Sequence, residues 1–202
     1  HMEYGNSCMG YEIAAGLGVK MADPSRDVFV LVGDASFLML SSEIVTSIQE
    51  GYKLSIVLLD NHGFGSIGNL SKSVGSEGFG TFARYRNSKT GQLDGTNLPI
   101  DFTKLAEGYG AHAIRATTLA DFESGLKAMK AENRTTVLVV EVDKDVSVGG
   151  YESWWDVPVA QVSQSKGVQQ AHAAYEKAVV KERHYEILVP KLNDKFPELK
   201  DK

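Results

Sequence analysis

The segment Val28-Phe29-Val30-Leu31-Val32-Gly33-Asp34-Ala35-Ser36-Phe37 determines the predicted fold. Its first five residues are apolar and mostly β-branched, which is typical of a strand buried in a parallel sheet. The strand stops at the small residues around Asp34. A single helix is expected next, because apolar residues recur at helical spacing until Gly51. These residues are Leu38, Leu40, Ile44, Val45 and Ile48.

A second apolar strand is predicted at 54–59, and it leads into Asp60-Asn61-His62-Gly63-Phe64-Gly65. A helix of ~14 residues rises ~21 Å, and a strand of about six residues spans ~20 Å. Both strands should therefore end at the same edge of the sheet. We expect Asp34 and Asn61, 27 positions apart, to lie side by side there, where open parallel sheets bind ligands.

The residues at these two positions favour a phosphorylated ligand with a metal ion. Gly33, Ala35 and Ser36 are small enough for backbone N–H groups and a helix N-terminus to approach a phosphate. A carboxylate ~4 Å from a phosphate oxygen is repelled by roughly 4 kcal/mol at an effective dielectric constant of ~20, so Asp34 requires a cation between them. Mg²⁺ fits, because it takes few ligands from protein and the rest from phosphates and water. Asp34, the side-chain oxygen of Asn61 and a carbonyl of the glycine-rich turn are the expected protein ligands.

The Gly-Asp-Ala-Ser-Phe motif at 33–37, the 27-residue step and the glycine two positions after Asn61 resemble the Mg²⁺-diphosphate motif of thiamine diphosphate enzymes. The version is the one found in acetohydroxyacid synthase. The resemblance implies that Asp34, Asn61 and the carbonyl of Gly63 bind the metal. Many members have Asn-Asn where this chain has Asp60-Asn61, but the ligand is the second of the two residues.

A further segment, Ser7-Cys8-Met9-Gly10-Tyr11, resembles the part of these enzymes that holds the aminopyrimidine ring. The resemblance implies that Ser7 offers its backbone carbonyl and that Met9 supports the bent cofactor. Taken alone, Met9 would be interpreted as a core residue at a helix start, and the downstream motif favours the cofactor role. The implied cofactor-binding residues are Ser7, Met9, Gly33, Asp34, Ala35, Ser36, Asn61, Gly63, Phe64 and Gly65.

Longer blocks of the chain, at 8–14, 43–54, 61–67 and 154–160, resemble the C-terminal part of the trihydroxycyclohexanedione hydrolase family of inositol catabolism. This resemblance implies the hydrolytic ring opening of a cyclic dione to 5-deoxyglucuronic acid, with the cofactor as electron sink. It implies an α/β fold with three layers, α/β/α, around a mostly parallel sheet.

In that family the catalytic glutamate belongs to an N-terminal pyrimidine-binding domain, which would lie upstream of residue 1. No catalytic residue is therefore expected in this chain, and the isolated fragment is expected to be inactive. Glu12, Glu43 and Glu50 are predicted to be solvated or interface charges. Because the cofactor of such enzymes lies between subunits, we expect a homodimer or higher homo-oligomer, with the Ala/Gly face at 10–18 and the 63–80 loop partly uncovered.

Two other functions fit the same residues. The first is a carboligase or decarboxylase that uses the same cofactor on 2-oxo acids. The second is a non-catalytic α/β module that binds another phosphorylated ligand, with Asp34 acting only as a helix cap.

Composition limits the class of protein and of partner. The chain has 202 residues, of which 43% are hydrophobic and 23% charged, and a net charge of −5. An acidic chain argues against nucleic-acid or anionic-membrane partners. The single cysteine, Cys8, excludes an internal disulfide and suits the cytoplasm. No apolar run approaches the ~20 residues needed to cross a bilayer, and His1-Met2 resembles a cloning remnant.

The rest of the chain alternates between helical and strand patterns, as expected of a parallel sheet covered on both faces. We expect a cofactor-binding domain at 1–165 and a helical appendage at 166–202. A long loop is predicted at 63–98, with Arg84, Tyr85 and Arg86 able to meet a substrate. The remaining predictions are helices at 10–21, 101–109, 119–131 and 166–188, and strands at 111–116 and 136–142.

Overall fold

The computed structural model describes residues 8–78, 80–146 and 156–182. The chain divides into two compact units, one made of His1–Asn69 and Gly78–Gly149, the other of Leu70–Glu77 and Gly150–Lys202. The first unit contains the sheet and all the described candidate site residues.

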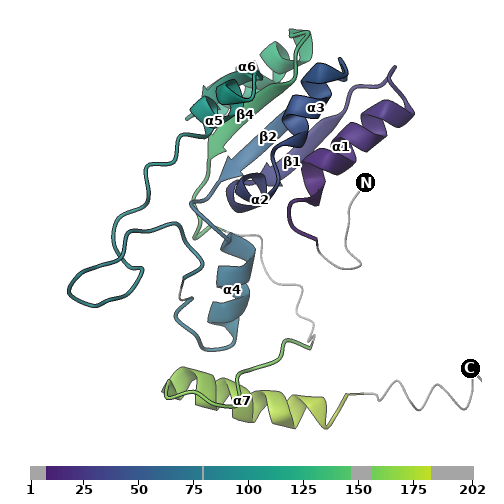
Figure 1. The fold of residues 1–202 in the computed structure, drawn as a ribbon. Helices are drawn as coiled ribbons and strands as arrows, with labels where there is room; N and C mark the ends of the chain where they lie inside the picture. The colour runs from purple at the N-terminus through teal and green to yellow at the C-terminus, as the bar shows by residue number, and fades with distance from the viewer. Residues whose placement is uncertain (1–7, 79, 147–155, 183–202) are drawn as a thin grey trace, which may run out of the picture. The chain divides into compact units, whose positions relative to one another are not determined.

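Four parallel strands form that sheet, in the order β1-β2-β4-β3. Figure 1 shows β1, β2 and β4 side by side. They are β1 (Phe29–Gly33), β2 (Ser55–Asp60), β3 (His112–Ala116) and β4 (Thr136–Glu141). The central strands β2 and β4 are apolar and largely buried, as the sequence predicts for strands covered on both faces, whereas the edge strands β1 and β3 are only partly buried. The predicted parallel α/β fold is confirmed.

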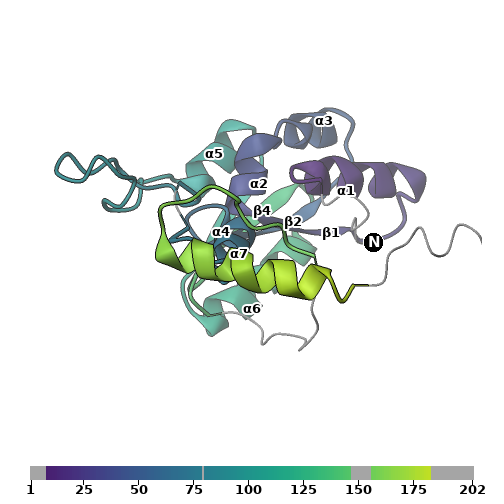
Figure 2. The ribbon, with the colours of Figure 1, turned by 90° about the horizontal axis from the view of Figure 1, so that it is seen from below.

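Helices cover the two faces of the sheet unequally, and Figure 2 shows the sheet between the two helical layers. One layer holds α1 (Tyr11–Ala22), α2 (Asp34–Met39), α3 (Glu43–Gln49) and α5 (Phe102–Gly108), and the other holds α6 (Leu119–Ala131). On the first side Phe37 and Phe102 meet edge to face, with ring centroids 6.0 Å apart. On the second side α6 packs on β3 and β4. Leu31 of β1, which points to that side, is 65% exposed.

The single helix predicted after Phe37 is wrong, because the structure has two short helices, α2 and α3. The helix breaks at Leu40, where φ is −154° and ψ is 80°. Ser41 is buried, and its hydroxyl lies 3.1 Å from the Tyr109 hydroxyl. The predicted apolar stripe is divided as a result. Ile44 is buried, whereas Leu38, Leu40, Val45 and Ile48 are exposed.

The predicted long loop at 63–98 is also partly wrong, because it contains the helix α4 (Gly65–Ser73). The segment that follows is tied back to the strand tips by backbone hydrogen bonds. Ala83 N donates to His62 O at 2.8 Å, and Leu98 N donates to Ala83 O at 2.8 Å. The glycines that suggested a loop instead permit close packing, since a Cβ on Gly68 would lie 2.9 Å from Thr81 Oγ1.

In the second unit α7 (Lys166–Val179) is shorter than the predicted helix at 166–188. It ends at Val179, and residues from 183 onward lie outside the described part of the chain. None of the helices in the described ranges combines the length and the apolar character needed to span a bilayer.

The small-residue face of α1 is covered at one glycine and open at another. Gly16 packs directly on β1, where a Cβ would lie 2.3 Å from Val30 Cγ2. Gly18, two residues later, has open space around it. The Ala/Gly face at 10–18 is therefore partly uncovered in this chain, as the sequence predicts.

These two glycines provide a matched test of the packing between α1 and β1. We expect Gly16→Ala to destabilise the chain by about 1–3 kcal/mol, because overpacking against a stiff valine outweighs the gain in helix propensity. Gly18→Ala should stabilise it by roughly 0.5–1 kcal/mol through helix propensity alone. Urea denaturation of both variants measures the difference, and equal stabilities would contradict the close contact.

Candidate functional site

The carboxyl ends of β1 and β2 bring Asp34 and Asn61 together, as the strand-helix-strand geometry predicts. Gly33 is the register partner of Leu59, so the residues that follow each strand emerge side by side. Gly63 N donates a buried hydrogen bond of 2.6 Å to Asp34 Oδ2. One end of the Asn61 amide lies 3.2 Å from Asp34 Oδ1. The two segments therefore form one site.

Asp34 is 3% exposed and sits at the first position of α2. Its Oδ1 atom accepts a hydrogen bond of 2.8 Å from the N–H of Ala35. Burial raises the pKa of Asp34 to about 6, and the neighbouring Asp60 carboxyl adds to the increase, while the N–H groups of Ala35 and Gly63 oppose it. A positive charge near this carboxylate would offset the cost of ionising it.

The Asn61 amide has two chemically distinct ends in this site. Its nitrogen faces Gly65, where a Cβ would lie 2.6 Å away. The other end lies 2.7 Å from the carbonyl oxygen of Gly63 and 3.2 Å from Asp34 Oδ1. With nitrogen turned to this end, the amide would donate two hydrogen bonds. If the amide oxygen occupies this end instead, the side-chain oxygens of Asn61 and Asp34 and the carbonyl oxygen of Gly63 lie close together.

The turn at Asn61-His62-Gly63 is held tightly from outside. Gly63 has φ of 147°, and a Cβ on it would lie 2.5 Å from Thr81 O, so only glycine fits. Phe64 N donates to the same Thr81 oxygen at 2.7 Å. The start of α4 is therefore fixed next to the Asn61 amide and the Gly63 carbonyl.

The small residues predicted to approach a phosphate occupy different environments. Ala35 and Ser36 are buried, and the Ala35 N–H is already bonded to Asp34. Gly33 has no atom within 4 Å of the position that a Cβ would take, so space is open beside it. The backbone around Gly33 is thus the most accessible part of this segment.

The segment predicted to hold a pyrimidine ring is only partly described. Ser7 lies outside the described residues. Met9 is 37% exposed, so it is not the core residue that the alternative interpretation expects. The next residue, Gly10, has φ of 88° and packs against Leu40, where a Cβ would lie 3.3 Å from Leu40 Cβ.

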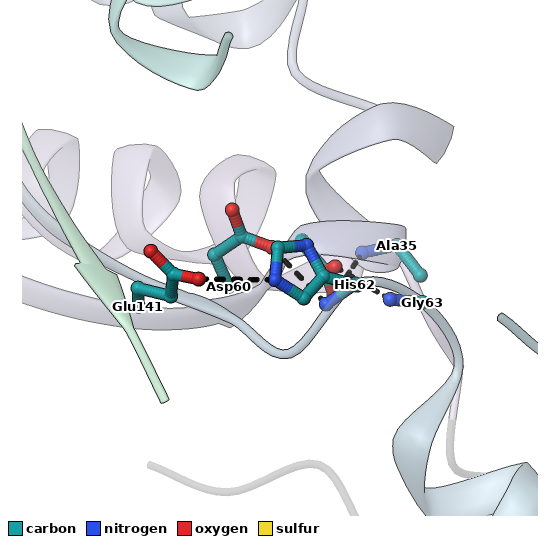
Figure 3. Close-up of polar contacts among 6 residues, drawn as sticks. Ala35, Asp60, His62, Gly63 and Glu141 are labelled. Atoms are coloured by element: carbon teal, nitrogen blue, oxygen red, sulfur yellow. Dashed lines mark hydrogen bonds and ion pairs between the residues drawn. The ribbon is translucent and has the colours of Figure 1, made fainter. Parts of the chain in front are cut away.

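Three polar residues beside the turn, to which the sequence alone assigned no role, are Asp60, His62 and Glu141 (Figure 3). Asp60 and Glu141 are register partners at the ends of β2 and β4. The His62 ring lies between them, with Nδ1 3.4 Å from Asp60 Oδ1 and Nε2 3.2 Å from Glu141 Oε1. In the sequence, an acidic residue stands at the end of each of two predicted strands, and this pattern could have indicated a polar cluster at the edge of the sheet.

Next to Glu141 the carboxyl edge is hollowed by a cavity of about 330 Å³. Its lining includes Leu59, Ala116, Phe122 and Val140. Within residues 8–78, 80–146 and 156–182, no group of three His, Cys, Asp or Glu side chains is arranged to hold a metal ion. A metal at the described strand tips would therefore need amide or carbonyl ligands.

Comparison with solved structures gives a neighbour with thiamine diphosphate chemistry. The chain is similar to the thiamine diphosphate-dependent 4-hydroxybenzoylformate decarboxylase of Rhodococcus jostii RHA1, with a TM-score of 0.55 and 28% identity. The match covers 69% of this chain and 24% of that protein.

Curated relatives share more of the sequence. The chain is 46% identical over 185 residues to 3D-(3,5/4)-trihydroxycyclohexane-1,2-dione hydrolase 2 of Bacillus cereus. It is 49% identical over 172 residues to the 3D-(3,5/4)-trihydroxycyclohexane-1,2-dione hydrolase of Geobacillus thermodenitrificans. These matches cover 92% and 85% of this chain, but 29% and 27% of the relatives. The resemblance to this group of hydrolases is thus confirmed over a part of their length.

The family model for the C-terminal TPP binding domain of thiamine pyrophosphate enzymes matches residues 1–141, which include both strand tips and the turn between β2 and α4. The chain therefore belongs to the family of thiamine pyrophosphate enzymes, as their C-terminal, cofactor-binding domain.

Proposed function

We propose that this chain is the diphosphate- and Mg²⁺-binding part of a hydrolase of inositol catabolism that opens trihydroxycyclohexane-1,2-dione to 5-deoxyglucuronic acid. The observation that carries the proposal is the identity of 46–49% to relatives of that name. The matched segment covers 29% of the first of these relatives, so the activity belongs to a longer protein.

The proposed metal ligands are Asp34 Oδ1, the Asn61 side-chain oxygen and the Gly63 carbonyl oxygen. In an octahedral Mg²⁺ site with bonds of about 2.1 Å, adjacent oxygens lie about 3 Å apart. The Asn61 amide lies 2.7 Å and 3.2 Å from the other two oxygens, which fits that spacing. The chemistry and the spacing of the donor set therefore support a small, hard cation.

The same proposal gives the neighbouring residues the task of binding the diphosphate and orienting the cofactor. The open backbone at Gly33, with Ala35, Ser36, Phe64 and Gly65, would surround the diphosphate. Ser7 and Met9 would hold the pyrimidine end. When bound, thiamine diphosphate supplies an electron sink for breaking the carbon–carbon bond next to a carbonyl. The chain's own residues bind the diphosphate and orient the cofactor.

No residue of this chain is proposed as catalytic. The glutamate that acts on the aminopyrimidine ring is proposed to come from a separate pyrimidine-binding domain. Within the chain, 1–165 would form the cofactor-binding domain and 166–202 a helical appendage. We propose a homodimer or higher homo-oligomer in the cytoplasm, without nucleic-acid or membrane partners. The net charge of −5 supports the absence of these two kinds of partner.

A second candidate keeps the cofactor and changes the substrate to a 2-oxo acid. The 28% identity to a decarboxylase of an aromatic 2-oxo acid favours it less than the 46–49% identity favours the hydrolase. A non-catalytic phospholigand module is the weakest candidate, because an acid that only caps a helix does not require the Asn61 amide and the Gly63 backbone to contact it.

Turnover separates the hydrolase from the decarboxylase. We expect the complete enzyme to consume the cyclic dione and to leave pyruvate and benzoylformate unchanged, with products identified by NMR. The purified 202-residue chain should give no product from any of these substrates. Decarboxylation of a 2-oxo acid by the complete enzyme, without dione hydrolysis, would reverse the assignment.

Ligand-dependent stability tests the metal and diphosphate site directly. Thiamine diphosphate at ~100 times its dissociation constant should add ~2.7 kcal/mol to the unfolding free energy, and only when Mg²⁺ is also present. Asp34→Ala should abolish this gain because it removes a metal ligand. Asp27→Ala, at an exposed site before β1, is the control and should retain it. Thermal denaturation reports the gain, and an equal gain without Mg²⁺ would argue against the metal site.

The raised pKa of Asp34 gives the site a pH dependence of known sign. Because the folded chain favours the protonated acid, this group's contribution to stability is fully present below pH 3.8 and is lost as the pH rises through about 6. Metal binding needs the ionised form, so Mg²⁺ affinity should fall about tenfold per pH unit below about pH 6.

The ¹³C shift of the Asp34 carboxyl measures this directly. We expect a titration midpoint near 6 without ligands and a lower midpoint with thiamine diphosphate and Mg²⁺. A midpoint near the ordinary value of 3.8 in the ligand-free chain would show that burial is not acting on Asp34 as described.

A further inference from the structure

The turn that carries Asn61 and Gly63 contains a strained residue between them. His62 has φ of 63°, and it is the single non-glycine residue with a positive φ in the described ranges. A side chain in the left-handed region costs conformational energy and persists only where its surroundings hold it. The contacts of His62 therefore fix the direction in which its two neighbours point.

Both main-chain groups of His62 are held. Its N–H donates to Asp60 Oδ1 at 3.1 Å, and its carbonyl accepts from Ala83 N at 2.8 Å. Asp60 is 4% exposed and adjoins Asp34, so it is part of the site itself. These contacts hold the backbone of His62. The Nε2 side of its ring, here called the outer side, is contacted by another residue.

Glu141 holds that outer side. It is the last residue of β4 and the register partner of Asp60, and Val142 N donates to Asp60 O at 2.9 Å just beyond it. From this strand tip its Oε1 lies 3.2 Å from His62 Nε2. Figure 3 marks this contact with a dashed line. The side chain of Glu141 is 57% exposed and that of His62 is 27% exposed. The ring is thus clamped between the tips of β2 and β4.

We propose that Glu141 is a positioning residue, which acts through His62 to keep the Asn61 amide and the Gly63 carbonyl aimed at the metal. The part of this inference that concerns the metal rests on the proposed function. The part that concerns the turn does not, because the turn geometry exists without ligand. Loss of the clamp allows His62 to relax toward ordinary φ values, which moves both neighbours and weakens the bond from Gly63 N to Asp34.

The core does not depend on Glu141. Phe37, Ile44 and Leu58, which are fully buried, lie in the main core cluster. The link from His62 O to Ala83 N also remains when Glu141 is shortened. A variant at this position should therefore fold, and its effect should be local to the turn.

The test uses ¹H–¹⁵N NMR of the ligand-free 202-residue chain with three variants. In Glu141→Ala, we expect the Gly63 amide proton to move upfield, and the Asn61 and Gly63 resonances to shift several times more than in the control. Glu141→Gln retains an acceptor for Nε2 and should restore most of the wild-type shifts. Glu123→Ala, at an exposed glutamate on α6, is the control. Indistinguishable turn resonances in Glu141→Ala and Glu123→Ala would overturn the proposal.

Calorimetric titration of Mg²⁺ with excess thiamine diphosphate adds the functional readout. Glu141→Ala should weaken the apparent affinity about tenfold, as is usual when a residue that orients a metal ligand is lost. Glu141→Gln and Glu123→Ala should stay within about twofold of wild type. A wild-type chain that binds no Mg²⁺ with the cofactor would refute the proposed function, while the NMR result would still decide the role of Glu141.

Discussion

One hydrogen bond connects the parts of this site: the N–H of Gly63 donates to the buried carboxylate of Asp34 at 2.6 Å. It joins the ends of two neighbouring strands across 29 residues of sequence. Bonds from an amide to an ionised carboxylate are short and strong, and burial strengthens them further. The Gly63 carbonyl is held by a separate contact, because its oxygen accepts a hydrogen bond from Gly65 N at 3.0 Å.

The surroundings of the same carboxylate destabilise its ionised form. It is removed from water and lies next to a second acid, Asp60, so its ionised form is unfavourable in the ligand-free chain. Natural sites often retain such groups because function requires them, at a cost in stability. Around Asp34 the sequence supplies small residues and a glycine turn, which add no opposing charge. The Mg²⁺ proposed for this site would supply the opposite charge that the surrounding residues do not.

The site was predictable from sequence to the extent that it depends on strand ends. The apolar runs at 28–32 and 54–59 located β1 and β2 to within one residue, and the position of Asp34 relative to Asn61 followed from parallel geometry. Features that depend on distant residues were not predictable. The break between α2 and α3 involves Tyr109, which lies 68 positions from Ser41.

Glu141 was missed for the same reason, since β4 follows β3 in sequence but also pairs with β2 in the sheet. The helix α4 was hidden by its glycines, which normally argue against a helix. Here Gly65 and Gly68 are required by the Asn61 amide and by Thr81, which approach too closely for a side chain.

Because the space around Gly63 is crowded, substitutions at Gly63 and at Asn61 should impair the protein in different ways. A side chain on Gly63 would collide with the backbone of Thr81 and Phe82 at 2.5 Å and 2.7 Å, so every replacement disturbs the folded chain and lowers its abundance in a cell. Asn61 is in a different position, because an amide can be exchanged for a side chain of similar size without such a collision. If Asn61 binds the metal as proposed, a survey of variants that scores protein level and growth separately would find Gly63 constrained in both scores and Asn61 constrained in growth alone.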